Sequence, residues 1–449
     1  MNNKENHNLE NTEMSDDKVT LENSRSSDDK NTHGDRHHTH HDGSHHSHHE
    51  HRSSHSSGRH HRRKHSSKKK KFKINSKLGW AGVIVICILI TIFIVVVANM
   101  DDRHTSFSDQ SNGEQTSENL LVEVINSEGI LVKNAVNQYL LIDLLNPANA
   151  NVIPHSFSNG EGRIDEQIPV SLKLSVKEGN AVLYKIELAT NVEFANATVS
   201  YLEAAHGTYD FEHLYTNTTY YYRVTAYTRK GAEIVTGSFK TSDTPRILSI
   251  DGLSNVRDIG NWRTDSGKRI KQGLLIRGVE MDGSVERGYC LTNEGLVDML
   301  EVFGIKTDLD LRTSSPTTKD ALGAGVKHKY YDMVMYDNIF TPEGKEKVRA
   351  VFEDLANPDN YPIYVHCTYG CDRTGTICYL LEALLGVSRG DCLRDYALSN
   401  MNIANIQAVE NGLKQYKGDT LKSQAEDYLL SCGVNEYQIN SIRKIFLED

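Results

Sequence analysis

The residues with the clearest capacity for chemistry lie in one stretch, 361–386, which reads YPIYVHCTYGCDRTGTICYLLEALLG. The run IYV predicts a short buried strand, and TGTICYLLEALLG predicts a helix with an apolar face. Between the strand and the helix lies the run His366-Cys367-Thr368-Tyr369-Gly370-Cys371-Asp372-Arg373-Thr374-Gly375. A cysteine therefore follows the strand directly, and an arginine comes six positions later.

This strand–loop–helix pattern is suited to holding a phosphate oxyanion and attacking it. Successive backbone N–H groups of such a loop can point inward around an anion, and the helix adds the positive end of its dipole. The same field stabilises a thiolate, so we expect Cys367 to be ionised near neutral pH and nucleophilic. Arg373 can grip two phosphate oxygens in bidentate fashion, which a lysine cannot do.

The remaining loop residues are expected to line this phosphate site. Gly370 permits a backbone angle that a Cβ would hinder, and the Thr374 hydroxyl can hydrogen-bond the thiolate. His366 is expected to orient the loop through backbone hydrogen bonds. The other expected lining residues are Thr368, Tyr369 and Cys371. A lone cysteine is usually only a small buried residue, but His, Cys, Gly, Arg and Thr together at this spacing favour catalysis.

The loop resembles the His-Cys-x-x-Gly-x-x-Arg-Thr/Ser motif of the protein tyrosine phosphatase superfamily. SNVRDIGNWRTDSGKRIKQGLLIRGVE (254–280) resembles the opening Asn-x-Arg-Asp-Leu-Gly-Gly segment of its bacterial tyrosine/serine phosphatase branch. KTDLDLRTSSP (306–316) and DYALSN (395–400) are similar to two further motifs of that branch. The resemblance covers about 246–449. Asn261 stands where the opening motif usually has its second glycine, which is a mild departure.

The resemblance implies phosphomonoester hydrolysis in two steps, without a metal or other cofactor. The Cys367 thiolate attacks phosphorus to form a cysteinyl-phosphate, which water then hydrolyses, while Arg373 and loop N–H groups meet the charge on the oxygens. A general acid must protonate the leaving oxygen. Asp372 is the first choice, with Asp332 or Asp337 of YYDMVMYD as the alternative. A purely structural Asp372 would instead cap the following helix.

The substrate implied is phosphotyrosine in proteins, with phosphoserine and phosphothreonine also open. A first alternative is a phosphoinositide or other small phosphomonoester. Relatives acting on phosphoinositides often hold lysine where this chain has Cys371, which speaks against a lipid. A second alternative is a surface adhesion or binding protein with a vestigial phosphatase domain. The intact Cys367, Asp372 and Arg373 oppose that reading. Arg312 is expected either as a second phosphate-side cation or in an ion pair with Asp258 or Asp310.

The elements around the loop indicate a multidomain chain. Its C-terminal part, 246–449, is expected to be an α/β cysteine-phosphatase domain with a mostly parallel central sheet flanked by helices. Alternating runs in 166–243 predict a β-sandwich before it, as in VSLKLSV, AVLYKIELA, ATVSYLEA, TYYYRVTAY and VTGSFKT. LYTNTTYYYRVTAYTRKG resembles the late strands of a fibronectin type III domain, with Leu214, Tyr220 or Tyr221, and Val224 in the core. Residues 101–165 are expected to hold a linker and a segment of unassigned fold.

An apolar segment, 78–100, predicts a single transmembrane helix. Residues 78–98, LGWAGVIVICILITIFIVVVA, form a run of 21 residues without a charge, and about 20 apolar residues span a bilayer as a helix. Eight lysines and arginines lie within 63–77, whereas only Arg103 follows within 15 residues. The positive-inside rule then places the N-terminus in the cytoplasm and the catalytic part outside the cell membrane.

The N-terminal tail, 1–77, is expected to be disordered because it has few apolar residues to bury. It holds 15 of the 21 histidines, which make zinc or nickel binding an alternative to a plain solvated tail. The tail carries 16 basic and 11 acidic residues, which leaves 34 basic and 49 acidic residues in the rest of the chain. That acidic remainder argues against nucleic acid as a partner.

Overall fold

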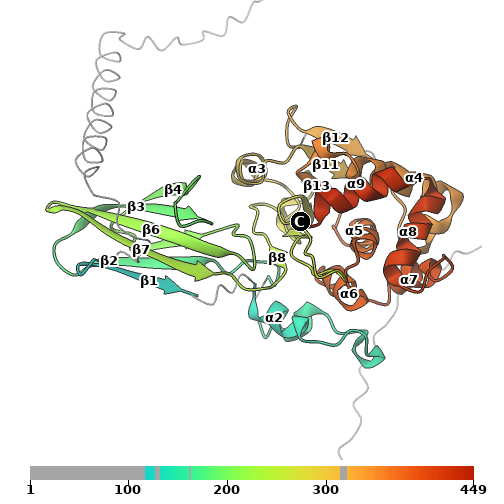
Figure 1. Cartoon of the computed structure of the whole chain (residues 1–449), viewed down its shortest axis with the longest axis horizontal. Coiled ribbons are helices and arrows are strands. Elements are labelled where there is room, and N and C mark those ends of the chain that lie inside the picture. The colour runs from blue at the N-terminus through green and yellow to red at the C-terminus, as the bar shows by residue number, and fades with distance from the viewer. Residues whose placement is uncertain (1–116, 127–131, 161–162, 314–320) are drawn as a thin grey trace, which may run out of the picture. The chain divides into compact units, whose positions relative to one another are not determined.

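The structure is a computed structural model that describes residues 117–126, 132–160, 163–313 and 321–449 (Figure 1). It contains two antiparallel sheets in the first half of this range and one mixed sheet in the second. The tail 1–77 and the expected membrane helix 78–100 lie outside the described residues. Within the described ranges, no helix is both long enough and apolar enough to cross a membrane.

The first part is a β-sandwich of two sheets, ordered β1-β2-β5 and β4-β3-β6-β7. The strands are β1 (Leu120–Ile125), β2 (Val170–Val176), β3 (Ala181–Ala189), β4 (Thr198–Glu203), β5 (Thr208–Phe211), β6 (Thr219–Thr228) and β7 (Gly231–Lys240). Alternate residues of each strand face one shared core, in which Leu214, Tyr220 and Val224 are buried. The sequence predicted five of these strands and missed β1 and β5. Membership of the fibronectin type III family stays a prediction.

The second part is built on a six-stranded sheet with the order β12-β11-β13-β10-β9-β8. Strands β12, β11, β13 and β10 are parallel, whereas β9 and β8 are antiparallel additions of two residues each. Their bounds are β8 (Arg246–Ile247), β9 (Arg257–Asp258), β10 (Leu275–Gly278), β11 (Thr307–Asp310), β12 (Lys327–Tyr330) and β13 (Ile363–His366). The sheet is therefore mixed, with a parallel centre.

Both faces of this sheet are covered, which explains why β10, β11 and β13 are buried along their whole length. Ile363 and Val365 of β13 face a large helical core, while Tyr364 between them faces a second core with Met299. The helices are α3 (Asn293–Val297), α4 (Pro342–Leu355), α5 (Asp372–Leu385), α6 (Arg389–Ala397), α7 (Gln407–Leu413), α8 (Leu421–Cys432) and α9 (Glu436–Phe446). The α/β fold expected for 246–449 is thus present.

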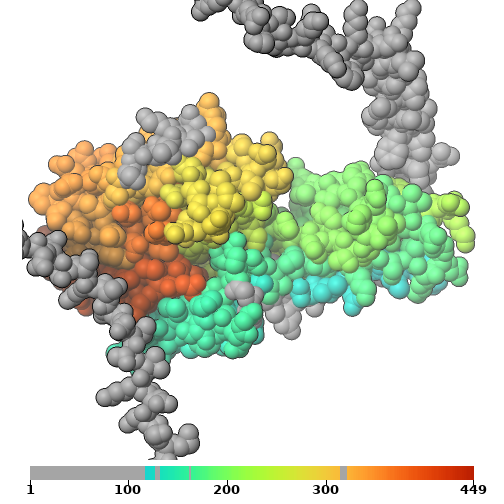
Figure 2. Space-filling view, turned by 180° about the vertical axis from the view of Figure 1, so that it is seen from behind, coloured from blue at the N-terminus to red at the C-terminus, as the bar shows by residue number. Residues whose placement is uncertain are grey.

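The connection between β1 and β2 leaves the sandwich and packs against the α/β domain. It contains α2 (Asn134–Leu140), whose Val136 and Tyr139 are buried in the same core as the central sheet and its helices. Arg394 of α6 donates a hydrogen bond to the Ile142 carbonyl at 3.0 Å. Figure 2 shows this green-blue region lying against the red C-terminal helices. The segment for which the sequence predicted no fold therefore contributes strand β1 to the sandwich and helix α2 to the core of the α/β domain.

Because α2 fills part of the hydrophobic core of the α/β domain, replacing Tyr139 by alanine should destabilise that domain. Tyr139 is fully buried, and truncating a large aromatic core residue costs about 3 kcal/mol or more. Chemical denaturation of residues 117–449 would measure this loss. Leu141→Ala is the matched control, because Leu141 is 84% exposed at the end of the same helix. Equal stability of both variants would contradict the shared core.

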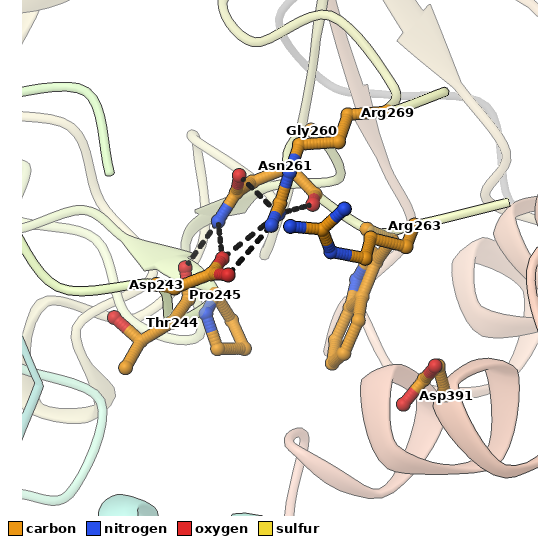
Figure 3. A pocket seen from close by; sticks show the side chains of 9 residues that line it. Asp243, Thr244, Pro245, Gly260, Asn261, Arg263, Arg269 and Asp391 are labelled. Carbon is orange, nitrogen blue, oxygen red and sulfur yellow. Dashed lines mark hydrogen bonds and ion pairs between the residues drawn. The ribbon is translucent and has the colours of Figure 1, made fainter. Parts of the chain in front are cut away.

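The sandwich and the α/β domain are joined by a network of charged and polar groups (Figure 3). Arg269 pairs with Asp243 at 2.6 Å, and the Asn261 amide donates to both Asp243 and the Thr244 carbonyl at 3.1 Å. These residues line a pocket of about 170 Å³ that none of the residues 366–374 borders. Asn261 has a φ of +74°, a left-handed conformation that asparagine tolerates. Asn261 can therefore stand where the family motif usually has a glycine, and its side chain adds the contact to Asp243.

Candidate active site

The expected phosphate loop runs from the end of β13 to the start of α5. β13 ends at His366 and α5 begins at Asp372, so Cys367 follows the strand directly and lies at the base of the loop. Its side chain is buried, with 2% of its surface exposed. The strand is parallel to both of its neighbours, β10 and β11. Cys367 is thus at the carboxyl end of the sheet, where open α/β folds bind ligands.

The five consecutive carbonyl groups of residues 367–371 each have a partner on the outer side of the loop. The Thr368 carbonyl accepts from the Glu280 N–H at 3.2 Å, the Tyr369 carbonyl from the Asn255 amide at 3.0 Å, and the Gly370 carbonyl from Arg277 at 2.9 Å. At the two ends, His366 Nδ1 lies 3.3 Å from the Cys367 oxygen, and the Gly375 N–H donates to the Cys371 oxygen at 2.9 Å.

Because these partners hold the carbonyl groups on the outer side of the loop, the N–H groups point toward its inner side. In a planar trans peptide the C=O of one residue and the N–H of the next point in opposite directions. In the described part of the chain, the N–H groups of 368–371 meet no acceptor. They are therefore free to bind an anion, with the N-terminus of α5 directly behind them.

Gly370 is required at its position for two reasons. Its φ is +67°, in the left-handed region that favours glycine. A Cβ on this residue would also lie 2.3 Å from the Gly278 oxygen of β10. The close approach allows Arg277 of the same strand to reach the Gly370 carbonyl.

Arg373 differs from the other arginines near the loop because, among the described residues, no carboxylate pairs with it. Its Nε donates to the Met333 carbonyl at 3.1 Å, and one terminal nitrogen lies 3.4 Å from the Thr313 hydroxyl. Arg312 instead pairs with Asp310, Glu280 and Asp282. The ion pair with Asp310 is thus the arrangement found for Arg312, and Arg373 keeps its charge available to an anion.

A buried clamp under the loop was missed by the sequence reasoning. Asp395 accepts from Arg257 at 3.0 Å and from Arg277 at 2.6 Å, and all three side chains are buried. Burial alone would raise the pKa of Asp395, but the two arginines outweigh it and hold that pKa below its usual range. All three residues lie in the recognised segments 254–280 and 395–400, but their spacing in the sequence did not indicate that they meet under the loop.

Asp372 lies at the first position of α5, and its carboxylate accepts a hydrogen bond from the Tyr336 hydroxyl. The two alternative acids lie elsewhere. Asp332 is exposed and pairs with Lys347 at 3.6 Å, and Asp337 is also exposed. The segment YYDMVMYD therefore brings a tyrosine to the loop where the sequence reasoning looked for an aspartate.

Two further loop residues, Thr374 and Cys371, do not make the contacts that the sequence suggested. The Thr374 hydroxyl is buried and has no hydrogen-bond partner in the described structure, so the expected bond to the Cys367 sulfur is not formed. Cys371 turns its sulfur toward the Tyr369 carbonyl at 3.2 Å. Burial, followed by the charge of Cys367, raises the pKa of Cys371 to about 11. Cys371 therefore stays a thiol near neutral pH.

His366 makes the expected approach to the Cys367 carbonyl and also an unexpected ion pair. Its Nε2 lies 3.0 Å from the Asp308 carboxylate of β11, without the angle of a hydrogen bond. Burial alone would lower the pKa of His366, but the charge of Asp308, with a smaller contribution from Asp310, raises it to about 9. An imidazolium thus lies under the loop at neutral pH.

This raised pKa predicts how stability depends on pH. The folded value of about 9 lies above the ordinary 6.5, so the stabilisation is fully present below pH 6.5 and is lost as pH rises through about 9. Thermal denaturation between pH 6 and pH 10 should show this decline. His366→Gln cannot titrate and should give a flatter curve. Parallel curves for the two proteins would contradict the ion pair.

A pocket of about 330 Å³ lies beside the loop. Tyr369 and Cys371 line it from the loop, and Tyr289 meets Tyr369 edge-to-face at 5.7 Å between ring centres. The β1–β2 connection contributes Asp165, which accepts from the Asn255 N–H at 2.5 Å. No group of three or more histidine, cysteine or acidic side chains in the described ranges is arranged to hold a metal ion.

The comparisons with known proteins point to a phosphatase. Residues 248–433 match the model of the tyrosine phosphatase family. A protein of Cupriavidus necator named as a tyrosine-protein phosphatase is 23% identical over 197 residues, which cover 38% of this chain and 68% of that protein. A tyrosine-protein phosphatase of Nostoc commune is 25% identical over 198 residues, covering 32% and 67%.

A solved structure also matches, that of the core catalytic domain of a PP-IP phosphatase from S. cerevisiae in complex with citrate. It is 19% identical, covers 32% of this chain and 88% of that one, and has a TM-score of 0.25. The sequence relatives support the assignment: residues 248–433 are similar to the tyrosine phosphatase family, and the chain is a phosphatase.

Proposed function

We propose that this chain hydrolyses phosphomonoesters through a cysteinyl-phosphate on Cys367, and that its substrate is phosphotyrosine in proteins. The observation that carries the proposal is the outward bracing of the carbonyls of 367–371, which leaves the N–H groups of 368–371 to receive an anion beside the cysteine. Arg373, without a carboxylate partner in the described residues, supplies the cation. Cys367, Arg373 and Asp372 are the proposed catalytic residues.

In the first step the Cys367 thiolate attacks phosphorus and the bond to the leaving oxygen breaks. Protonated Asp372 gives its proton to that oxygen, so the product leaves as a neutral alcohol or phenol. In the second step Asp372 takes a proton from water as the water oxygen attacks phosphorus. The S–P bond then breaks, and inorganic phosphate and the thiolate are released. The loop N–H groups and Arg373 stabilise the equatorial oxygens in both steps.

Trapping the intermediate tests this mechanism. Residues 117–449 would be mixed with p-nitrophenyl phosphate in EDTA and reductant and quenched in acid within the first turnover. Mass spectrometry should find phosphate on the peptide that holds Cys367, together with a burst of p-nitrophenol. Turnover without a phosphorylated peptide, or phosphate on another residue, would reject the proposal.

The surroundings of the loop support a substrate with one phosphate on an aromatic group. Tyr289 and Tyr369 offer aromatic surface beside the loop, and the neighbouring Arg312 is neutralised by three carboxylates. A polyphosphorylated ligand needs several available cations. We therefore expect kcat/KM for phosphotyrosine peptides to exceed that for phosphoserine peptides and phosphoinositides. A preference for phosphoinositides would favour the alternative substrate class.

We further propose that 78–100 anchors the chain in the cell membrane with the catalytic domain outside. The support is the uncharged segment and the basic residues before it. Protease added to intact cells should then cleave the C-terminal domain, and complete protection would contradict the orientation. The histidine-rich tail lies outside the described residues; its zinc binding remains a hypothesis that calorimetry on a 31–65 peptide would test.

A further inference from the structure

One segment, 331–340, contacts both proposed polar catalytic residues. The Met333 carbonyl accepts from Arg373 at 3.1 Å. Three residues later, the Tyr336 hydroxyl donates to Asp372. The Tyr336 N–H also lies 3.4 Å from the hydroxyl of Thr376, one turn into α5. This segment therefore fixes the two charged side chains relative to one another.

The hydrogen bonds form a chain with one possible direction. A phenol has a single hydrogen to donate. The Asp372 oxygen that faces Tyr336 accepts this hydrogen, and the other carboxyl oxygen can carry the proton that the general acid gives away. Because Tyr336 gives its hydrogen to Asp372, the Tyr396 hydroxyl at 2.8 Å must donate to the Tyr336 oxygen. Burial and the bonds to Asp372 and Tyr396 raise the pKa of Tyr336, so its hydroxyl stays protonated.

Local backbone and packing hold both tyrosines in place. Tyr336 has a φ of +53°, which is uncommon and strained for a bulky side chain. Tyr396 is 1% exposed and packs so closely on α5 that a Cβ at Gly375 would lie 2.9 Å from its ring. A glycine at the start of α5 is thus needed to admit the ring that supports Tyr336.

We propose that Tyr336 is the positioning residue for the general acid: supported by Tyr396, its hydroxyl holds the Asp372 carboxyl group in one orientation beside the catalytic loop. This inference rests on the proposed role of Asp372. Without the hydroxyl, the Asp372 side chain gains rotational freedom, and its proton meets the leaving oxygen less often. The attack by Cys367 and the binding of phosphate do not depend on Tyr336.

The experiment compares kcat/KM for two aryl phosphates, because kcat/KM reports the first chemical step and the need for an acid in that step depends on the leaving group. Phenolate is a poor leaving group and requires protonation, whereas p-nitrophenolate leaves without much help. Tyr336→Phe should lower kcat/KM for phenyl phosphate about tenfold and kcat/KM for p-nitrophenyl phosphate less than about twofold. The ratio of the two rates is independent of the fraction of folded enzyme.

Three variants make the comparison decisive. Tyr331→Phe is the matched control, because Tyr331 lies in the same segment but donates to Asp354 at 2.5 Å; its rate ratio should stay at the wild-type value. Tyr396→Phe should change the ratio in the same direction as Tyr336→Phe, by a smaller factor. Asp372→Asn should change it most, by about 10²-fold or more.

Two failures are distinguishable. If Asp372→Asn changes the ratio but Tyr336→Phe lowers both rates equally or neither, Tyr336 does not position the acid. If Asp372→Asn leaves the ratio unchanged, the proposed acid itself is wrong, and the inference about Tyr336 falls with it.

Discussion

Replacing Cys367 by serine should lower kcat for p-nitrophenyl phosphate by at least about 10⁴-fold while leaving the fold intact. Cys367 lies at the base of the loop, before the N-terminus of α5, where free N–H groups favour a negatively charged group in the transition state. A serine hydroxyl remains protonated in the same field and is a poor nucleophile. Cys367 is almost fully buried, so an isosteric replacement avoids a cavity and keeps the loop packed.

Cys371→Ser is the matched control for the nucleophile. It removes the second thiol of the same loop, whose pKa is raised by burial, and it should keep most of the activity. Steady-state turnover in EDTA, with far-UV circular dichroism for folding, measures both variants. If serine at 367 retained activity and serine at 371 did not, the nucleophile would be the wrong cysteine. If both variants matched the wild type, the cysteinyl mechanism would be wrong.

Replacing Asp395 by asparagine should destabilise the chain by about 3–5 kcal/mol, because it leaves Arg257 and Arg277 buried without their counter-charge. Activity should fall as well under conditions where the variant is folded, because Arg277 holds the Gly370 carbonyl of the catalytic loop. Urea denaturation followed by fluorescence gives the stability, and turnover in the absence of urea gives the activity.

Asp391→Asn on the same helix is the control for Asp395. Asp391 makes a partly exposed pair with Arg394 at 2.7 Å, and such pairs contribute about 1 kcal/mol or less.

The sequence alone predicted the phosphate loop and its position between a strand and a helix. Cys367, Gly370 and Arg373 lie within seven consecutive residues between a strand and a helix. Their relative geometry is therefore set by local backbone structure, which sequence spacing reports directly. The alternating pattern likewise predicted five sandwich strands, because side chains of a strand alternate between two faces. The family resemblance added the α/β fold of 246–449.

Only the tertiary structure decided which residues support that loop. Arg277 and Asn255 reach it across about a hundred residues of sequence, and Arg277 is itself paired with Asp395 from a later helix. No local pattern encodes such contacts. Tyr336, rather than the alternative acids Asp332 and Asp337, is the residue of its segment that contacts Asp372. The β1–β2 connection has short apolar runs without a clear period, and its core role follows only from the surface it covers. Packing between distant segments, rather than local propensity, fixed these parts of the site.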